Sequence, residues 1–102
     1  MDFIKTTGVL NEVLSERERQ EKLHGVDPKH TPETWLMILG EEVGEVNKAA
    51  LETRFGVEGA SWEQYRHELV QVAAVAVAMI ESFDRQYQAA VANEFLGIEA
   101  YP

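Results

Sequence analysis

Five side chains with oxygen donors are spaced so that they could bind a divalent cation. Glu42 and Glu45 are three residues apart. Glu68 and Gln71 repeat this spacing further along the chain. On a helix, side chains at i and i+3 share a face, so each pair can converge on one ion. Glu41 lies about 100° around the helix from Glu42. Oxygen ligands of this kind suit Mg²⁺ or Mn²⁺ rather than zinc or copper.

Glu42 and Glu45 interrupt the apolar stripe of their predicted helix. The stripe consists of Trp35, Leu36, Ile38, Leu39, Val43, Val46 and Ala50. Burying an unpaired carboxylate is costly, and acids within one helical turn repel one another. A bound cation would offset both costs, so the pattern favours a metal site. The alternative is a solvated acidic face that forms ion pairs with Lys48 or Arg66.

The composition limits the class of partner. A chain of 102 residues can form one domain with a modest core, and chains of this size often complete their burial by association. We therefore expect a homodimer or homotetramer. The formal net charge of −9 opposes binding to nucleic acid polymers. A small phosphorylated ligand that arrives with Mg²⁺ is compatible with this charge, because the metal reverses the local electrostatics.

Cysteine content and hydropathy indicate a soluble, cytoplasmic protein. The absence of cysteine excludes disulfides, thiolate metal sites and thiol nucleophiles. The longest apolar run, Val72–Ile80, is about half of the roughly 20 residues that a membrane span needs. The N-terminal residues lack a signal-peptide pattern. We therefore expect no membrane partner.

The elements that must position the acids are predicted to be helices. A first helical pattern runs from about Thr7 to Leu23, and a loop containing Gly and Pro follows. Thr31 as N-cap and Pro32 at the first helical position predict a second helix that continues to roughly Thr53.

A third helix is predicted from Trp62 towards Ala90. Ser61 and Gln64 have the spacing of a capping box. The centre of this helix is apolar nearly all the way round, which predicts burial on more than one side. The short connection makes it antiparallel to the second helix, so the two acid pairs can face each other. The sequence thus predicts a single all-α domain, a helical bundle with the carboxylates on an antiparallel hairpin, in which residues 93–102 form a short helix or a tail.

The acid pattern resembles a known family signature. The arrangement Glu41-Glu42-x-x-Glu45, followed after 22 residues by Glu68-x-x-Gln71, resembles the Glu-Glu-x-x-Glu … Glu-x-x-Asp motifs of the all-α nucleoside triphosphate pyrophosphohydrolases. This MazG-like superfamily includes dimeric dUTPases and dCTPases. The resemblance extends over roughly residues 21–84. It implies Mg²⁺-dependent hydrolysis of a nucleoside triphosphate to the monophosphate and pyrophosphate, in a house-cleaning role.

The resemblance also implies roles for individual residues. The metal ligands would be Glu42, Glu45 and Glu68, with Gln71 at the position of the family's aspartate. Gln71 keeps a carbonyl oxygen but removes one negative charge, which is expected to lower Mg²⁺ affinity or the number of bound ions. Glu41 would be the acid nearest the attacking water, as a metal ligand or as the general base.

Four further residues are candidates for substrate contact, each with a structural alternative. Lys48 could meet a phosphate, or it could form an ion pair within its helix. Trp35 could stack on a nucleobase, although core packing is the commoner role of such a residue. His24 and His30 flank the loop before the second helix, where related pyrophosphohydrolases contact substrate. Exposed loop histidines usually have no such role.

Two other functions compete with the enzyme. The chain could be a catalytically weakened or inactive MazG-like module for nucleotide binding or helical interaction, with Gln71 marking lost catalysis. A di-iron carboxylate bundle would need two Glu-x-x-His pairs on separate helices. Only Glu21-x-x-His24 qualifies. The acid motif does not select the base or the sugar of a substrate.

Overall fold

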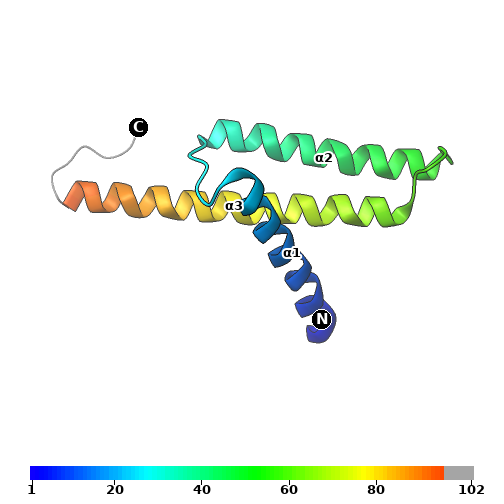
Figure 1. Ribbon diagram of the computed structural model, residues 1–102, viewed down its shortest axis with the longest axis horizontal. Helices are drawn as coiled ribbons and strands as arrows, with labels where there is room; N and C mark the ends of the chain where they lie inside the picture. Colours follow the sequence, from blue (N-terminus) through cyan, green and yellow to red (C-terminus); the bar gives the residue numbers. More distant parts are fainter. Residues whose placement is uncertain (96–102) are drawn as a thin grey trace.

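Three helices and no strand make up the part of the chain that the computed structural model describes, residues 1–95. Helix α1 is Phe3–His24, α2 is Pro32–Arg54 and α3 is Trp62–Phe95. Helices α2 and α3 lie antiparallel and side by side, and α1 crosses α3 near its middle (Figure 1). The predicted all-α bundle with an antiparallel hairpin is therefore confirmed.

The first helix begins earlier than the sequence pattern predicted. The Asp2 side chain accepts hydrogen bonds from the backbone N–H groups of Ile4 and Lys5, both at 3.1 Å. An aspartate in this position satisfies N–H groups that have no partner within the helix. The cap therefore extends α1 four residues before Thr7, the predicted start.

The second helix begins where the sequence predicted. Thr31 Oγ1 accepts a hydrogen bond from the Thr34 backbone N–H at 3.3 Å, and Pro32 is the first helical residue. The chain then reverses after α2 through Gly56 and Gly59, which have φ angles of 72° and 85°. Because residues with a side chain rarely adopt these left-handed backbone conformations, glycine suits the turn that makes α3 antiparallel to α2.

The third helix has half of the predicted capping box. Ser61 Oγ accepts a hydrogen bond from the Gln64 backbone N–H at 3.1 Å. The Gln64 side chain does not return to Ser61 but donates to Glu68 Oε1 at 2.6 Å. Helix α3 continues beyond Ala90 to Phe95. Positions 93–95 of the predicted tail are thus helical, and the rest of it lies outside the described residues.

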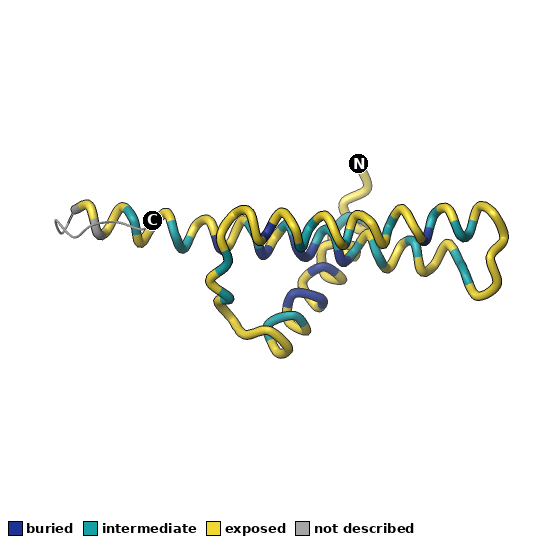
Figure 2. The backbone as a smooth tube through the Cα atoms, turned by 90° about the horizontal axis from the view of Figure 1, so that it is seen from above, coloured by how far each residue is buried: buried dark blue, intermediate teal, exposed yellow. Residues whose placement is uncertain are grey.

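The apolar core follows the line where α2 meets α3. Trp35, Val75 and Ala78 are buried there. Ile38, Leu39 and Met79 pack against them. Figure 2 shows that buried positions also occur where α1 crosses α3. Helix α3 is thus covered on two sides, as its apolar centre predicted.

Large apolar side chains also remain exposed on α1 and α3. They include Phe3, Ile4, Leu10, Leu14, Ile80, Phe83 and Tyr87. Ile80 is 60% exposed and Phe83 is 61% exposed, so one side of α3 is not covered within the chain. None of the helices in the described part combines the length and apolar character needed to cross a membrane.

Candidate functional site

The predicted metal-binding acids gather around Glu42 at the contact between α2 and α3. Glu42 is half-buried. Burial raises the pKa of its carboxyl group, and the negative charges of Glu68, Glu45 and Glu41 raise it further. A shift with these causes requires the other carboxylates to lie near Glu42. The fold therefore brings the two acid motifs together, although Glu41 and Glu45 are themselves exposed.

Helix α1 adds an acid and an arginine that the sequence analysis missed. The Glu16 side chain is only 10% exposed and also contributes to the raised pKa of Glu42. Arg19 Nε donates to both Glu16 carboxylate oxygens at 3.0 Å. Both residues lie in a run of alternating charges, which is typical of a solvated helix face. The sequence signal that could have indicated the burial of Glu16 is its spacing from Val13. Glu16 lies three residues after Val13, so the two side chains share one face of α1, and both are buried.

Gln71 on α3 contacts this α1 acid. Its side chain is buried and donates a hydrogen bond to the Glu16 carboxylate. This bond helps the Arg19 contact to lower the pKa of Glu16. The glutamine is thus held by a protein carboxylate at the place where the family motif has aspartate.

In the conformations of this structure, these side chains do not form the coordination sphere of a metal ion. Within residues 1–95, no group of three or more acidic or histidine side chains is arranged so that it could hold a metal ion. Glu68 is held by Gln64 and Glu16 is held by Arg19. The donors are nevertheless all oxygen atoms, from three carboxylates and the Gln71 amide, which fits the chemistry of Mg²⁺.

A cavity of about 460 Å³ adjoins the acid cluster. This volume is in the usual range of small-molecule sites. Its lining includes six of the predicted site residues: His24, His30, Trp35, Glu41, Glu42 and Gln71. Arg17, Arg19 and Arg85, none of them predicted, also line it. Lys48 is not among the lining residues and is exposed on α2.

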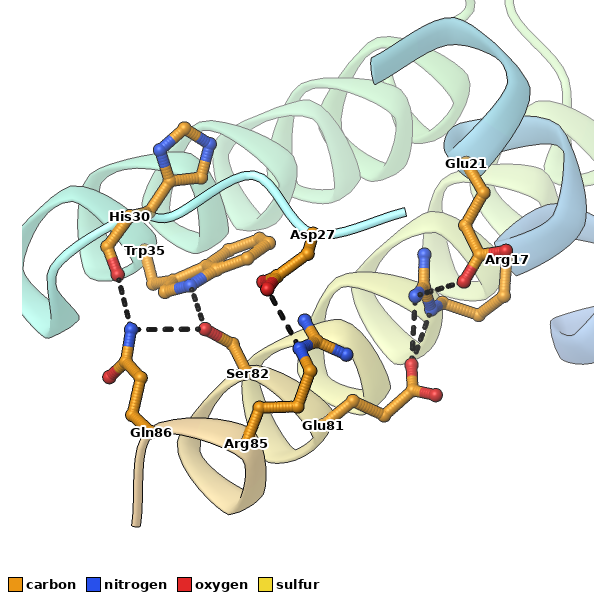
Figure 3. Close-up of polar contacts among 9 residues, drawn as sticks. All are labelled: Arg17, Glu21, Asp27, His30, Trp35, Glu81, Ser82, Arg85 and Gln86. Atoms are coloured by element: carbon orange, nitrogen blue, oxygen red, sulfur yellow. Dashed lines mark hydrogen bonds and ion pairs between the residues drawn. The ribbon is translucent and has the colours of Figure 1, made fainter. Parts of the chain in front are cut away.

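Trp35 forms part of the cavity wall and is also a core residue. Its indole Nε1 donates to Ser82 Oγ at 3.1 Å, and only 8% of the residue is exposed. The His30 ring approaches it edge-on, with ring centroids 4.9 Å apart. Figure 3 shows His30 and Trp35 beside the α3 residues Ser82 and Gln86. Core packing therefore accounts for most of the Trp35 surface.

Arg17 joins α1 to α3 at the edge of the cavity. Its Nε and Nη2 donate to Glu81 Oε1 at 3.0 and 2.8 Å, and Nη2 also donates to Glu21 at 3.2 Å (Figure 3). Nη1 donates to Gln20 at 3.3 Å. Each nitrogen of this buried guanidinium thus has a partner, so Arg17 has a structural role in α1 packing.

Comparison of the chain with protein-family models, with curated protein sequences and with solved structures finds no match. The resemblance to the pyrophosphohydrolases therefore depends on the acid motifs of the sequence alone.

Proposed function

We propose that the protein is a Mg²⁺-dependent nucleoside triphosphate pyrophosphohydrolase that converts a nucleoside triphosphate and water into the monophosphate and pyrophosphate. One observation carries the proposal: Glu42 is half-buried among the other motif acids, and it lines a cavity large enough for a small molecule. Like charges that gather around a half-buried carboxylate next to a cavity are costly for stability, so such an arrangement favours a function that uses them.

Each acid has a role in the proposed reaction. Glu42, Glu45 and Glu68 would hold Mg²⁺, or Mn²⁺ in its place, with the Gln71 carbonyl oxygen as a further donor. When bound, the cation would supply charge neutralisation for the phosphates and would polarise the α-phosphate. Glu41, at the cavity wall, accepts a proton from the water that attacks the α-phosphorus. A new P–O bond forms to this water, the bond to the bridging oxygen breaks, and pyrophosphate leaves.

The remaining cavity residues suit the rest of the nucleotide. Arg19 is close enough to the Glu42 charge to interact with it, so its guanidinium lies near the place where phosphates would bind. His24 and His30 line the same cavity and are proposed as substrate contacts. Lys48 would approach the phosphates from the exposed side of α2. The apolar wall at Trp35 suits a nucleoside better than a phosphate.

The test is product analysis with a panel of ribo- and deoxynucleoside triphosphates and Mg²⁺ or Mn²⁺. We expect at least one substrate to give monophosphate and pyrophosphate. Glu42→Gln and Glu45→Gln should abolish this turnover while the helical circular dichroism signal persists. Glu33→Gln is the matched control, because Glu33 is exposed in the first turn of the same helix.

Two results would contradict the proposal. One is unchanged turnover in both Glu42→Gln and Glu45→Gln. The other is the absence of turnover across the whole panel with either metal.

The alternative proposal is a MazG-like nucleotide-binding or helical interaction module with weakened or lost catalysis. The observation that favours it is the buried Gln71, whose amide is engaged by Glu16. If catalysis has been weakened in this way, Gln71→Asp should raise Mg²⁺-dependent turnover from a low base, because it restores the missing charge. A decrease in turnover would show that the site uses glutamine, and would exclude this alternative.

A further inference from the structure

The three arginines of the cavity differ in how many of their donors are engaged. All three nitrogens of Arg17 donate to protein acceptors. Arg19 makes a two-point contact with Glu16. The contact of Arg85 is a single ion pair, in which Nε lies 3.0 Å from Asp27 Oδ1. That nitrogen is buried, but the angle of its N–H group towards Asp27 does not meet the geometry of a hydrogen bond. Arg85 Nη1 and Nη2 have no partner among the described residues.

Arg85 and Asp27 lie where the connection between α1 and α2 meets α3. Gln86 Nε2 donates to the His30 carbonyl oxygen at 3.1 Å, which fastens the same connection next to the ion pair (Figure 3). The side chains of Arg85 and Asp27 are 36% and 41% exposed. Arg85 lines the cavity, and Asp27 lies between the lining residues Val26 and Pro28, so the ion pair borders the cavity.

Arg85 and Asp27 lie at one end of the cavity, and the acids lie at the other end. Gln71, which lies among the acids, and Arg85 are on the same helix, and their positions imply a separation of roughly 21 Å along the axis. Between these two ends, the lining residues that α2 and α3 contribute are apolar: Trp35, Ile38, Val75 and Ala78. A polyphosphate would be poorly solvated along such a wall, whereas a sugar and base fit it. With the α-phosphate at the acids, the base edge points towards Arg85.

We infer that Arg85 and Asp27 read the edge of the nucleobase, and that the base is guanine. This inference rests on the proposed function for the placement of the phosphates. A guanidinium presents paired N–H donors, which match the adjacent O6 and N7 acceptors of guanine. A carboxylate presents paired acceptors, and guanine alone among the common bases has two adjacent donors, N1–H and the 2-amino group. The ligand replaces the weak contact between Arg85 and Asp27 with contacts to both.

The test is calorimetric binding of non-hydrolysable α,β-methylene analogues of the guanosine, adenosine, cytidine and uridine triphosphates in the presence of Mg²⁺. We expect the guanine analogue to bind the protein about tenfold more tightly than the others, as one bidentate base contact supplies. Arg85→Gln and Asp27→Asn should each remove most of this preference. Arg85→Lys keeps the charge but not the paired donors, so it should lose the preference while the loop stays attached.

Two exposed residues provide matched controls, Arg54→Gln and Asp84→Asn, and both should leave the preference unchanged. If the ion pair only fastens the loop, its variants will weaken the binding of all four analogues equally, which would overturn the inference. A preference for another base, or a guanine preference that survives in the variants, would also overturn it. Turnover without a base preference would support the proposed function and contradict the guanine inference. Guanine-selective binding without turnover would contradict the proposed function and support the role of Arg85 and Asp27 in base recognition.

Discussion

Glu42 and Glu16 are neighbouring carboxylates with opposite pKa shifts. Burial and the surrounding acids raise the pKa of Glu42. The hydrogen bond from Arg19 lowers the pKa of Glu16, and the one from Gln71 adds to this effect. Glu16 therefore stabilises the fold above its ordinary pKa and loses that contribution as the pH falls through its lowered value. Glu42 has the opposite effect, since its ionisation opposes folding.

The sign of the Glu42 shift leads to a stability prediction. Between its ordinary and its raised pKa, Glu42 binds more protons in the folded than in the unfolded state, so stability falls as the pH rises through that window. In metal-free protein, Glu42→Gln should therefore raise the melting temperature at neutral pH by a few °C, on the order of a fraction of 1 kcal/mol. The difference in melting temperature from the wild type should disappear below about pH 4, where Glu42 is protonated in both the folded and the unfolded state.

Melting curves in EDTA, recorded across this pH range, provide the measurement, and Glu33→Gln serves as the control. Added Mg²⁺ should then raise the melting temperature of the wild type through preferential binding to the folded state. It should have little effect on Glu42→Gln. A variant that is less stable than the wild type at neutral pH would show that Glu42 is a satisfied surface residue.

At the scale of elements, the sequence predicted the helices that have local signals. Thr31 and Pro32 marked the start of α2, and Ser61 marked that of α3. The start of α1 was missed because Asp2 was not considered as a cap, and the end of α3 because that helix continues without a strong stop signal.

The candidate site was predictable only in part. The i, i+3 pairs on α2 and α3 could be recognised, since a short hairpin makes them face each other. The contribution of α1 could not, because the angle at which α1 crosses α3 depends on long-range contacts. One of these is the ion pair between Arg17 and Glu81, which are 64 positions apart. Arg85 was missed for the same reason, since its partner Asp27 lies in a loop far away in sequence.

This dependence of α1 on polar contacts can be tested with Glu81→Gln. The substitution leaves the Arg17 guanidinium, 10% exposed, with Glu21 as its remaining carboxylate partner. Removing one partner of a fully buried pair costs about 3–5 kcal/mol. Because Glu81 is 45% exposed, the expected loss is smaller, about 1–2 kcal/mol. Urea denaturation measures this loss, and hydrogen exchange should show reduced protection in α1. Asp84→Asn is the control, and equal stability of the two variants would contradict a fastening role for Glu81.

The whole molecule is too open for a compact monomer of its size. Its radius of gyration is 17.2 Å, whereas a compact chain of about 100 residues has a radius near 13 Å. Its accessible surface is 7708 Å², against roughly 5,800 Å² expected for a folded monomer of this mass. The excess exceeds the roughly 800 Å² that each partner buries in a standard interface. We therefore propose that the chain forms a homodimer or homotetramer.

The exposed stack of Phe83 and Tyr87 provides a specific test of this assembly. Their rings are 5.9 Å apart on α3, and both side chains are about 60% exposed, next to the equally exposed Ile80. Light scattering after size exclusion should give a multiple of the 11.5 kDa chain mass for the wild type. Phe83→Asp should shift the protein towards the monomer, because a charge replaces a large apolar contact. Phe55→Asp, at an even more exposed phenylalanine in the turn after α2, should not do so. A wild type that remains monomeric at micromolar concentration would contradict the assembly, and equal dissociation by both variants would place the interface elsewhere.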